Sequence, residues 1–139
     1  AVRAVGSYLQ DQGLNLLINN AGVSSHATLH SLDSQDMLSV FATNVVGPLQ
    51  VVKEFLPLLE KAVKGTGKKG LSCSRAAIIN VSAKLGSIGL YLGVSEAPMY
   101  PYCASKALLR VEHSMRGILT VLASLSGAFL DWEGNSLPW

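Results

Sequence analysis

Tyr102 and Lys106 are the residues whose types and spacing point most directly to chemistry. They are the first and last residues of Tyr-Cys-Ala-Ser-Lys, and on a helix that spacing places them one turn apart on the same face. A free phenol has a pKa of about 10, and a fixed ammonium nearby favours the phenolate. Such a phenol can donate a hydrogen bond to a carbonyl oxygen that gains negative charge, and then give it a proton.

Two further polar groups follow short apolar runs. Residues 19–22 (Asn-Asn-Ala-Gly) come after the run 14–18, and residues 80–82 (Asn-Val-Ser) end the run that starts at residue 76. Both runs are typical of parallel strands that are covered on both faces. Ligands of an open parallel sheet bind at the carboxyl ends of its strands. We therefore expect these two groups to lie beside the Tyr102 turn.

The remaining elements follow from apolar periodicity. Helices are expected over residues 1–12, from about 31 to 59 with a bend at Gly47-Pro48, and from Tyr102 to Gly117. Gly13 suits a helix terminator, residues 86–98 form a long loop, and residues 118–123 are expected to be a third strand. This alternation predicts an α/β fold with a doubly wound parallel sheet, followed by an irregular tail over 124–139.

Composition limits the classes of function. The chain has 139 residues, 49% of them apolar and 14% charged, enough for one packed domain. Its net charge of +2 is dispersed, and Lys68-Lys69 stand in a glycine-rich loop, which favours a solvated loop over a nucleic-acid surface. No run reaches the roughly 18 apolar residues of a membrane span. Cys73 and Cys103 lack metal-ligand spacing, so we expect no metal site and a reducing, cytoplasmic location.

The polar groups occur in a characteristic order along the chain. Asn-Asn-Ala-Gly after a strand, Asn44 inside the next helix, Asn-Val-Ser after the next strand and Tyr-x-x-x-Lys after a loop together resemble the short-chain dehydrogenase/reductase family. The resemblance covers roughly residues 1–123 and is most marked for carbonyl-reductase-like members related to sniffer and the bacterial C-factor, partly through residues 77–82 and 85–88. It implies a Rossmann-like NAD(P)-binding domain over 1–123 and a divergent tail over 124–139.

The resemblance also implies residue roles. Tyr102 matches the catalytic acid/base, Lys106 the lysine that favours its phenolate and binds the nicotinamide ribose, and Asn44 the asparagine that bends the helix and holds a relay water. The adenine end of the cofactor is implied to lie beside Asn20, Ala21 and Gly22. The family implies hydride transfer between NADP(H) or NAD(H) and a carbonyl or alcohol substrate, and often a homodimer formed through the two long helices.

The chain departs from the family pattern at three places. The family has Asn-x-Ser-Ser, but Ala83 stands at the second serine, so Ser82 becomes the candidate for the substrate-binding hydroxyl, provided that a local bulge turns it inward. Ser87 is a less favoured substitute. The helix from Tyr102 is about two turns shorter than in the family. No Gly-x-x-x-Gly-x-Gly phosphate loop precedes residue 1, which predicts an incomplete fold that lacks the first βαβ units.

Three hypotheses therefore stand. The first is an oxidoreductase fragment, which on its own could be inactive. The second is a catalytically impaired scaffold that binds a nucleotide or a partner subunit, as Ala83 and the missing phosphate loop suggest. The third is a segment that does not fold alone, because a parallel sheet without its first strands has an unpaired apolar edge.

Overall fold

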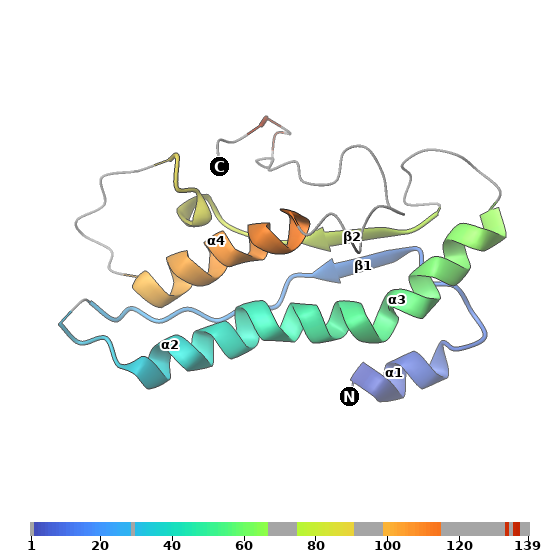
Figure 1. Cartoon of the computed structure of the whole chain (residues 1–139), viewed down its shortest axis with the longest axis horizontal. Coiled ribbons are helices and arrows are strands. Elements are labelled where there is room, and N and C mark those ends of the chain that lie inside the picture. Colours follow the sequence, from blue (N-terminus) through green and yellow to red (C-terminus); the bar gives the residue numbers. More distant parts are fainter. Residues whose placement is uncertain are drawn as a thin grey trace.

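The computed structural model of the chain describes residues 2–28, 30–66, 75–90 and 99–114, together with positions 133, 135 and 136. The elements are shown in Figure 1 and are, in chain order, α1 (Val2–Tyr8), β1 (Leu16–Asn19), α2 (Ser34–Phe41), the π-helical turn η1 (Ala42–Val46), α3 (Gly47–Thr66), β2 (Ala77–Asn80), the 3-10 turn η2 (Lys84–Gly86) and α4 (Tyr100–Ser114). The expected third strand at 118–123, the domain boundary at residue 123 and most of the tail lie outside the described residues.

The two strands form a parallel pair. Leu17 lies opposite Ile78 and Asn19 opposite Asn80, and the pairing continues beyond the last strand residues, where the Val81 amide donates to the Asn19 carbonyl at 2.9 Å. The α/β class and the parallel sheet are therefore confirmed. Because the strands run in the same direction, the polar residues that follow them emerge at one edge of the sheet.

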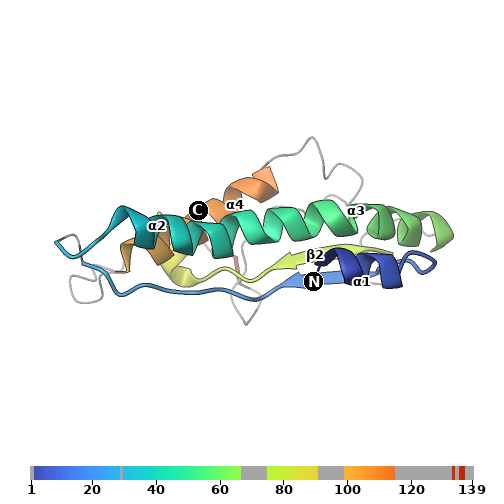
Figure 2. The same cartoon turned by 90° about the horizontal axis from the view of Figure 1, so that it is seen from below.

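Helices α2, α3 and α4 lie over one face of this sheet. Figure 2 shows α2, α3 and α4 on the same side of the two strands. Successive side chains of a strand point to opposite faces, and Leu16, Ile18 and Ile79 remain 37%, 52% and 43% exposed. The expectation that both faces of each strand are covered is thus wrong for the part of the chain that the structure describes.

The segment α2–η1–α3 is one helical run with an irregular turn inside it. Asp33 caps its start, with its carboxylate accepting from the Gln35 amide at 3.0 Å. The sequence predicts the bend at Gly47-Pro48, but Gly47 is regular helix (φ −55°, ψ −60°) and the irregular turn comes just before it. Pro48 has no N–H to donate to residue 44, so the π-helical turn lies where a regular α-helical hydrogen bond is already missing.

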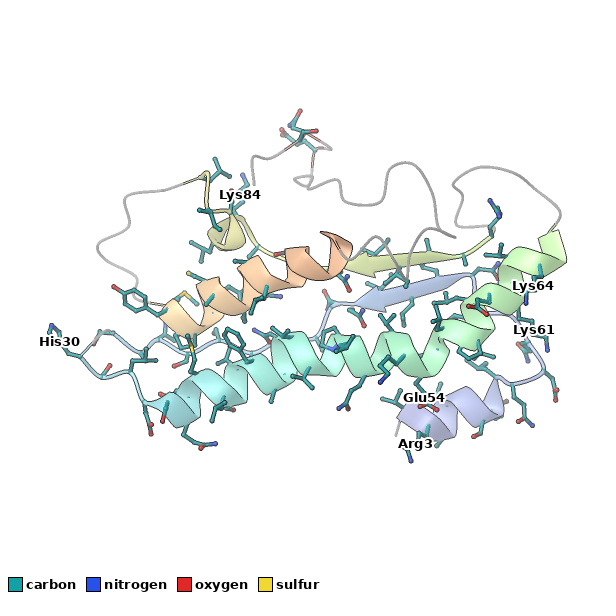
Figure 3. The ribbon with its side chains drawn as sticks, viewed as in Figure 1. Arg3, His30, Glu54, Lys61, Lys64 and Lys84 are labelled. Carbon is teal, nitrogen blue, oxygen red and sulfur yellow. The ribbon has the colours of Figure 1, made fainter. Side chains whose placement is uncertain are left out.

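Helix α3 also provides most of the core and anchors α1. Within the described ranges, the buried apolar side chains are Val40, Phe55, Leu58, Leu59, Ala62 and Ala76. Helix α1 ends at Tyr8, earlier than expected, and lies against α3, where Figure 3 shows Arg3 near Glu54. Gly13 is not the terminator of α1: a Cβ on Gly13 would come within 2.9 Å of the Ala62 Cα. The glycine permits close packing of the chain against α3.

None of the helices in the described ranges is long and apolar enough to cross a membrane.

Candidate active site

A cavity of about 450 Å³ lies at the carboxyl ends of β1 and β2, against the first turns of α4. It is lined by Asn20, Gly22, Val23, Ser24, Val81, Ser82, Leu85, Met99, Tyr102 and Lys106. Five of the seven site residues that the sequence predicts are in this set. Of the other two, Asn44 lies behind the cavity wall and the exposed Ala21 is outside it. The structure therefore brings the three polar groups of the sequence together.

Lys106 is the buried cation of this cavity. The residue is only 4% exposed, and its Nζ donates a 2.8 Å hydrogen bond to the Val81 carbonyl at the end of β2. The same Nζ lies 5.5 Å from the centre of the Tyr102 ring, within the range of a cation–π contact. Burial lowers the pKa of Lys106 below its ordinary value. The ammonium is thus fixed between the end of the sheet and the tyrosine.

Asn44 links the cavity wall to α4. The residue is 1% exposed, and its Oδ1 accepts from the Val23 amide at 2.8 Å, while its Nδ2 donates to the Val23 carbonyl at 2.8 Å and to Ser105 Oγ at 2.9 Å. Ser105 Oγ in turn donates to the Tyr102 carbonyl at 2.8 Å. Both amide protons of Asn44 are therefore used to hold the loop after β1 against the turn that carries Tyr102.

Ser82 lines the cavity, but its proton is directed elsewhere. Its Oγ donates a 3.0 Å hydrogen bond to the Lys106 carbonyl, so the hydroxyl ties the end of β2 to α4. Ala83 is half-buried in extended backbone (φ −150°, ψ 156°). Ser87 is 7% exposed, and its Oγ accepts from the Leu90 amide at 3.1 Å. Both serine hydroxyls therefore make hydrogen bonds to the backbone of the protein, Ser82 as a donor and Ser87 as an acceptor.

Two glycines permit close contacts that the sequence did not predict. A Cβ on Gly22 would lie 3.2 Å from Asn44 Oδ1 and 3.4 Å from Lys106 Nζ. A Cβ on Gly86 would lie only 2.7 Å from the Lys106 carbonyl carbon, so η2 can pack on α4 only with glycine at this position. The requirement for glycine at position 86 cannot be recognised from the local sequence, because it arises from the backbone of Lys106 in another element, α4.

The remaining wall residues come from loops beside the predicted motifs. Val23 and Ser24 follow residues 19–22, Leu85 follows Ser82, and Met99 precedes α4. Leu85 belongs to the segment 85–88 that carries part of the family resemblance, and for Val23, Ser24 and Met99 proximity to the motifs was the available signal. Cys103, next to Tyr102, is half-buried and unpaired, and burial raises the pKa of its thiol, which disfavours the reactive thiolate.

Comparison with known proteins places this arrangement in a family. A family model described as short chain dehydrogenase matches residues 1–116. Human 17-beta-hydroxysteroid dehydrogenase type 6 is 32% identical over 107 residues, which cover 76% of this chain and 28% of that protein.

Two solved structures extend the comparison. The NADPH-bound carbonyl reductase from chicken fatty liver is 34% identical, with a TM-score of 0.84 over all of this chain and 68% of its own. The carbonyl reductase Sniffer of D. melanogaster is 29% identical, with a TM-score of 0.83 over 99% of this chain and 71% of its own.

These matches confirm the Rossmann-like fold class and the resemblance to sniffer-related carbonyl reductases. The chain spans less than a third of the human dehydrogenase and about two thirds of the carbonyl reductases. The match of the family model over most of the chain, together with the cavity that Tyr102 and Lys106 share, leads to one conclusion: the chain belongs to the short-chain dehydrogenase family.

Proposed function

We propose that the chain forms the catalytic part of an NAD(P)-dependent oxidoreductase that transfers hydride between a nicotinamide cofactor and a carbonyl or alcohol substrate. The observation that carries this proposal is the joint placement of Tyr102 and the buried Lys106 in one cavity at the carboxyl ends of two parallel strands. A proton donor and a cation that are held together in a concave site suit a reaction in which an oxygen gains negative charge.

The cavity fits the nicotinamide end of NADP(H) or NAD(H). A volume of about 450 Å³ suits a nicotinamide ribose with a small substrate. Gly22 has no side chain at the point where a Cβ would crowd the Lys106 ammonium, which leaves that group accessible from the cavity. The resemblance assigns Asn20, Ala21 and Gly22 to the adenine end of the cofactor and Lys106 to the nicotinamide ribose hydroxyls; the place of Gly22 beside Lys106 favours the nicotinamide ribose for this glycine. When bound, the nicotinamide supplies or accepts the hydride.

Tyr102 handles the proton in this mechanism. In the reduction, the carbonyl carbon gains a C–H bond, the C=O π bond breaks, and the oxygen takes the phenolic proton of Tyr102. Lys106 favours the resulting phenolate by its charge. Lys106 donates one of its three ammonium protons in the hydrogen bond to the Val81 carbonyl. The other two can be donated to the ribose or to a water molecule. We assign Asn44 to the proton relay, where a carbonyl oxygen of this residue would accept a hydrogen bond from the relay water, since both of its amide protons are already donated.

The substrate oxygen also needs a hydrogen-bond donor beside Tyr102. Ser82 is our candidate because it lines the cavity, and its role requires the hydroxyl to rotate away from the Lys106 carbonyl. The apolar wall residues Val23, Leu85 and Met99 would face the hydrocarbon part of the substrate. They favour an uncharged carbonyl compound, because apolar walls do not compensate the desolvation of a charge.

The proposal includes a homodimer and a cytoplasmic location. Leu38 on α2 and Leu49 on α3 are 62% and 45% exposed, and Leu108 on α4 is 37% exposed. Exposed leucines on long helices suit a contact between two copies through these helices. The unpaired Cys103 thiol is compatible with a reducing compartment.

The test is calorimetry of the purified chain with NADPH and NADH in parallel, followed by a screen of aldehydes and ketones at 340 nm. We expect saturable binding of at least one cofactor and consumption of the reduced form with a carbonyl. A folded chain, checked by circular dichroism, that binds neither cofactor would contradict the proposal for this chain.

A second candidate function is a catalytically impaired scaffold that binds a nucleotide or a partner subunit. Ala83 favours it, because alanine has no hydroxyl for a substrate oxygen. The variant Ala83→Ser separates the two candidates. The proposed oxidoreductase, in which Ser82 is the donor, should turn over with alanine or serine at position 83, whereas an impaired scaffold should bind nucleotide and remain inactive with either residue.

A further inference from the structure

The parallel pair β1–β2 is joined by a side-chain amide at each end. At the start of the strands, Asn15 Nδ2 donates to the Arg75 carbonyl at 2.8 Å. At their carboxyl ends, Asn19 Nδ2 donates to Asn80 Oδ1 at 2.7 Å. Asn19 and Asn80 are direct partners in the register, so their side chains leave the sheet side by side. We call the Asn19–Asn80 contact the amide bridge.

The amide bridge lies one residue from the carbonyl that holds Lys106. The Val81 amide donates to the Asn19 carbonyl at 2.9 Å, and the Val81 carbonyl accepts from Lys106 Nζ at 2.8 Å. Asn19 therefore contacts the end of β2 twice, through its side chain at Asn80 and through its backbone at Val81. Beyond Val81 the two strands have no further pairing in the described residues, so these contacts fix the direction of the Val81 carbonyl.

We propose that Asn19 and Asn80 are positioning residues for Lys106, acting through the Val81 carbonyl. An ammonium on a residue that is 4% exposed needs a well-placed acceptor, because burying a charge without a partner is costly. Without the amide bridge, the end of β2 can turn and the Val81 carbonyl leaves the Lys106 ammonium. The lysine side chain then moves from the wall into the open cavity, and its charge is no longer fixed beside Tyr102.

The role of Lys106 in the reaction rests on the proposed function, but its position can be measured without turnover. Competitive acetylation with trace acetic anhydride over a range of pH, read by mass spectrometry of the Lys106 peptide, gives both the pKa of the amine and its limiting reactivity. The exposed Lys84, which Figure 3 shows on η2, is the reference lysine in every sample.

The variants are Asn19→Leu, Asn80→Leu and the milder Asn80→Ala, which removes the acceptor without adding bulk. Asn15→Leu is the matched control, because it removes an amide contact between the same chain segments at the opposite end of the sheet. All four are checked for folding by circular dichroism and thermal unfolding, so that loss of sheet stability is measured separately from the position of Lys106.

We expect the limiting acetylation rate of Lys106 to rise by roughly fivefold in the amide-bridge variants, the equilibrium factor for losing one ordinary hydrogen bond. The pKa of Lys106 should rise toward its ordinary value as the amine becomes solvated. Asn15→Leu should change the melting temperature but neither property of Lys106. The double variant Asn19→Leu/Asn80→Leu should resemble each single variant, since both remove the same contact.

The inference is overturned if Lys106 keeps its wild-type pKa and reactivity in Asn80→Ala and in whichever leucine variants fold, or if Asn15→Leu changes them to the same extent. A failure of cofactor binding or carbonyl reduction would count against the proposed function and leave the acetylation result as it stands.

Discussion

Asn44 and Ser105 lie 61 residues apart in the chain, and a 2.9 Å hydrogen bond from Asn44 Nδ2 to Ser105 Oγ joins the π-helical turn η1 to α4. Ser105 Oγ in turn donates to the Tyr102 carbonyl, and the Asn44 side chain is hydrogen-bonded to both the backbone N–H and the backbone carbonyl of Val23. The turn that carries Tyr102 is therefore fixed to the loop after β1 through one buried amide. π-helical turns often occur at functional sites, and here the turn contains the residue that makes this connection.

The first prediction concerns this amide. Asn44→Ala removes three hydrogen bonds and takes this partner from the part-buried backbone groups of Val23 and from the buried Ser105 hydroxyl, so we expect the free energy of unfolding to fall by about 3 kcal/mol. The measurement is urea unfolding followed by circular dichroism. Thr43→Ala, at the exposed neighbouring position of the same turn, should change stability by no more than about 0.5 kcal/mol. Equal losses in the two variants would show that the amide network is not what stabilises this region.

The second prediction separates the two tyrosines of α4. Tyr102→Phe should lower kcat for carbonyl reduction by roughly 10²- to 10⁴-fold, because it removes the proton donor, while cofactor binding should change little. Tyr100→Phe is the control, since Tyr100 is 49% exposed and is not among the cavity-lining residues. Steady-state kinetics and calorimetry on both variants test this. A Tyr102→Phe variant with wild-type kcat would exclude the phenol as the acid.

The third prediction concerns the pH dependence of stability. Burial lowers the pKa of Lys106 in the folded chain, so between that value and the ordinary value of about 10.4 the unfolded chain binds a proton that the folded chain does not. Stability contributed through this group is then lowest below the folded pKa and rises as the pH increases through it. Lys106→Met removes the titrating group and keeps a side chain of similar length. As the pH rises toward 10, the wild type should therefore gain stability relative to the variant. Urea midpoints over pH 6–10 would contradict this if the difference is constant.

The fourth prediction concerns Gly86. Gly86→Ala would place a Cβ within 2.8 Å of the Lys106 carbonyl carbon and oxygen, and this backbone cannot yield without moving α4. We expect a loss of about 1–3 kcal/mol, as for other overpacked sites. Gly65→Ala in α3 is the matched control, because no atom lies within 4 Å of the position that its Cβ would take, and it should be neutral or stabilising by up to about 1 kcal/mol. Thermal unfolding of both variants decides the point, and a harmless Gly86→Ala would mean that η2 and α4 are not tightly packed.

The type and order of the elements could be predicted from the sequence, because they depend on local patterns. The apolar runs before Asn19 and Asn80 indicated the two parallel strands, and the apolar periodicity over about 31–59 indicated the helical run that contains α2 and α3. The spacing of Tyr102 and Lys106 placed them on one face of a helix. The position of polar residues after parallel strands then predicted that these groups share one cavity, since all parallel strands end at the same edge.

Other features could not be predicted, because they are properties of pairs of distant residues. The displaced irregular turn at Ala42–Val46, the direction of the Ser82 hydroxyl toward the Lys106 carbonyl and the need for glycine at position 86 all depend on how α4 packs against η1 and η2. The sequence by itself determined which side chains could serve as the proton donor, the fixed cation and the hydrogen-bonding amide. Only the tertiary structure decided which of their protons are already used, because a hydrogen bond depends on angstrom-scale distances between elements that no local pattern specifies.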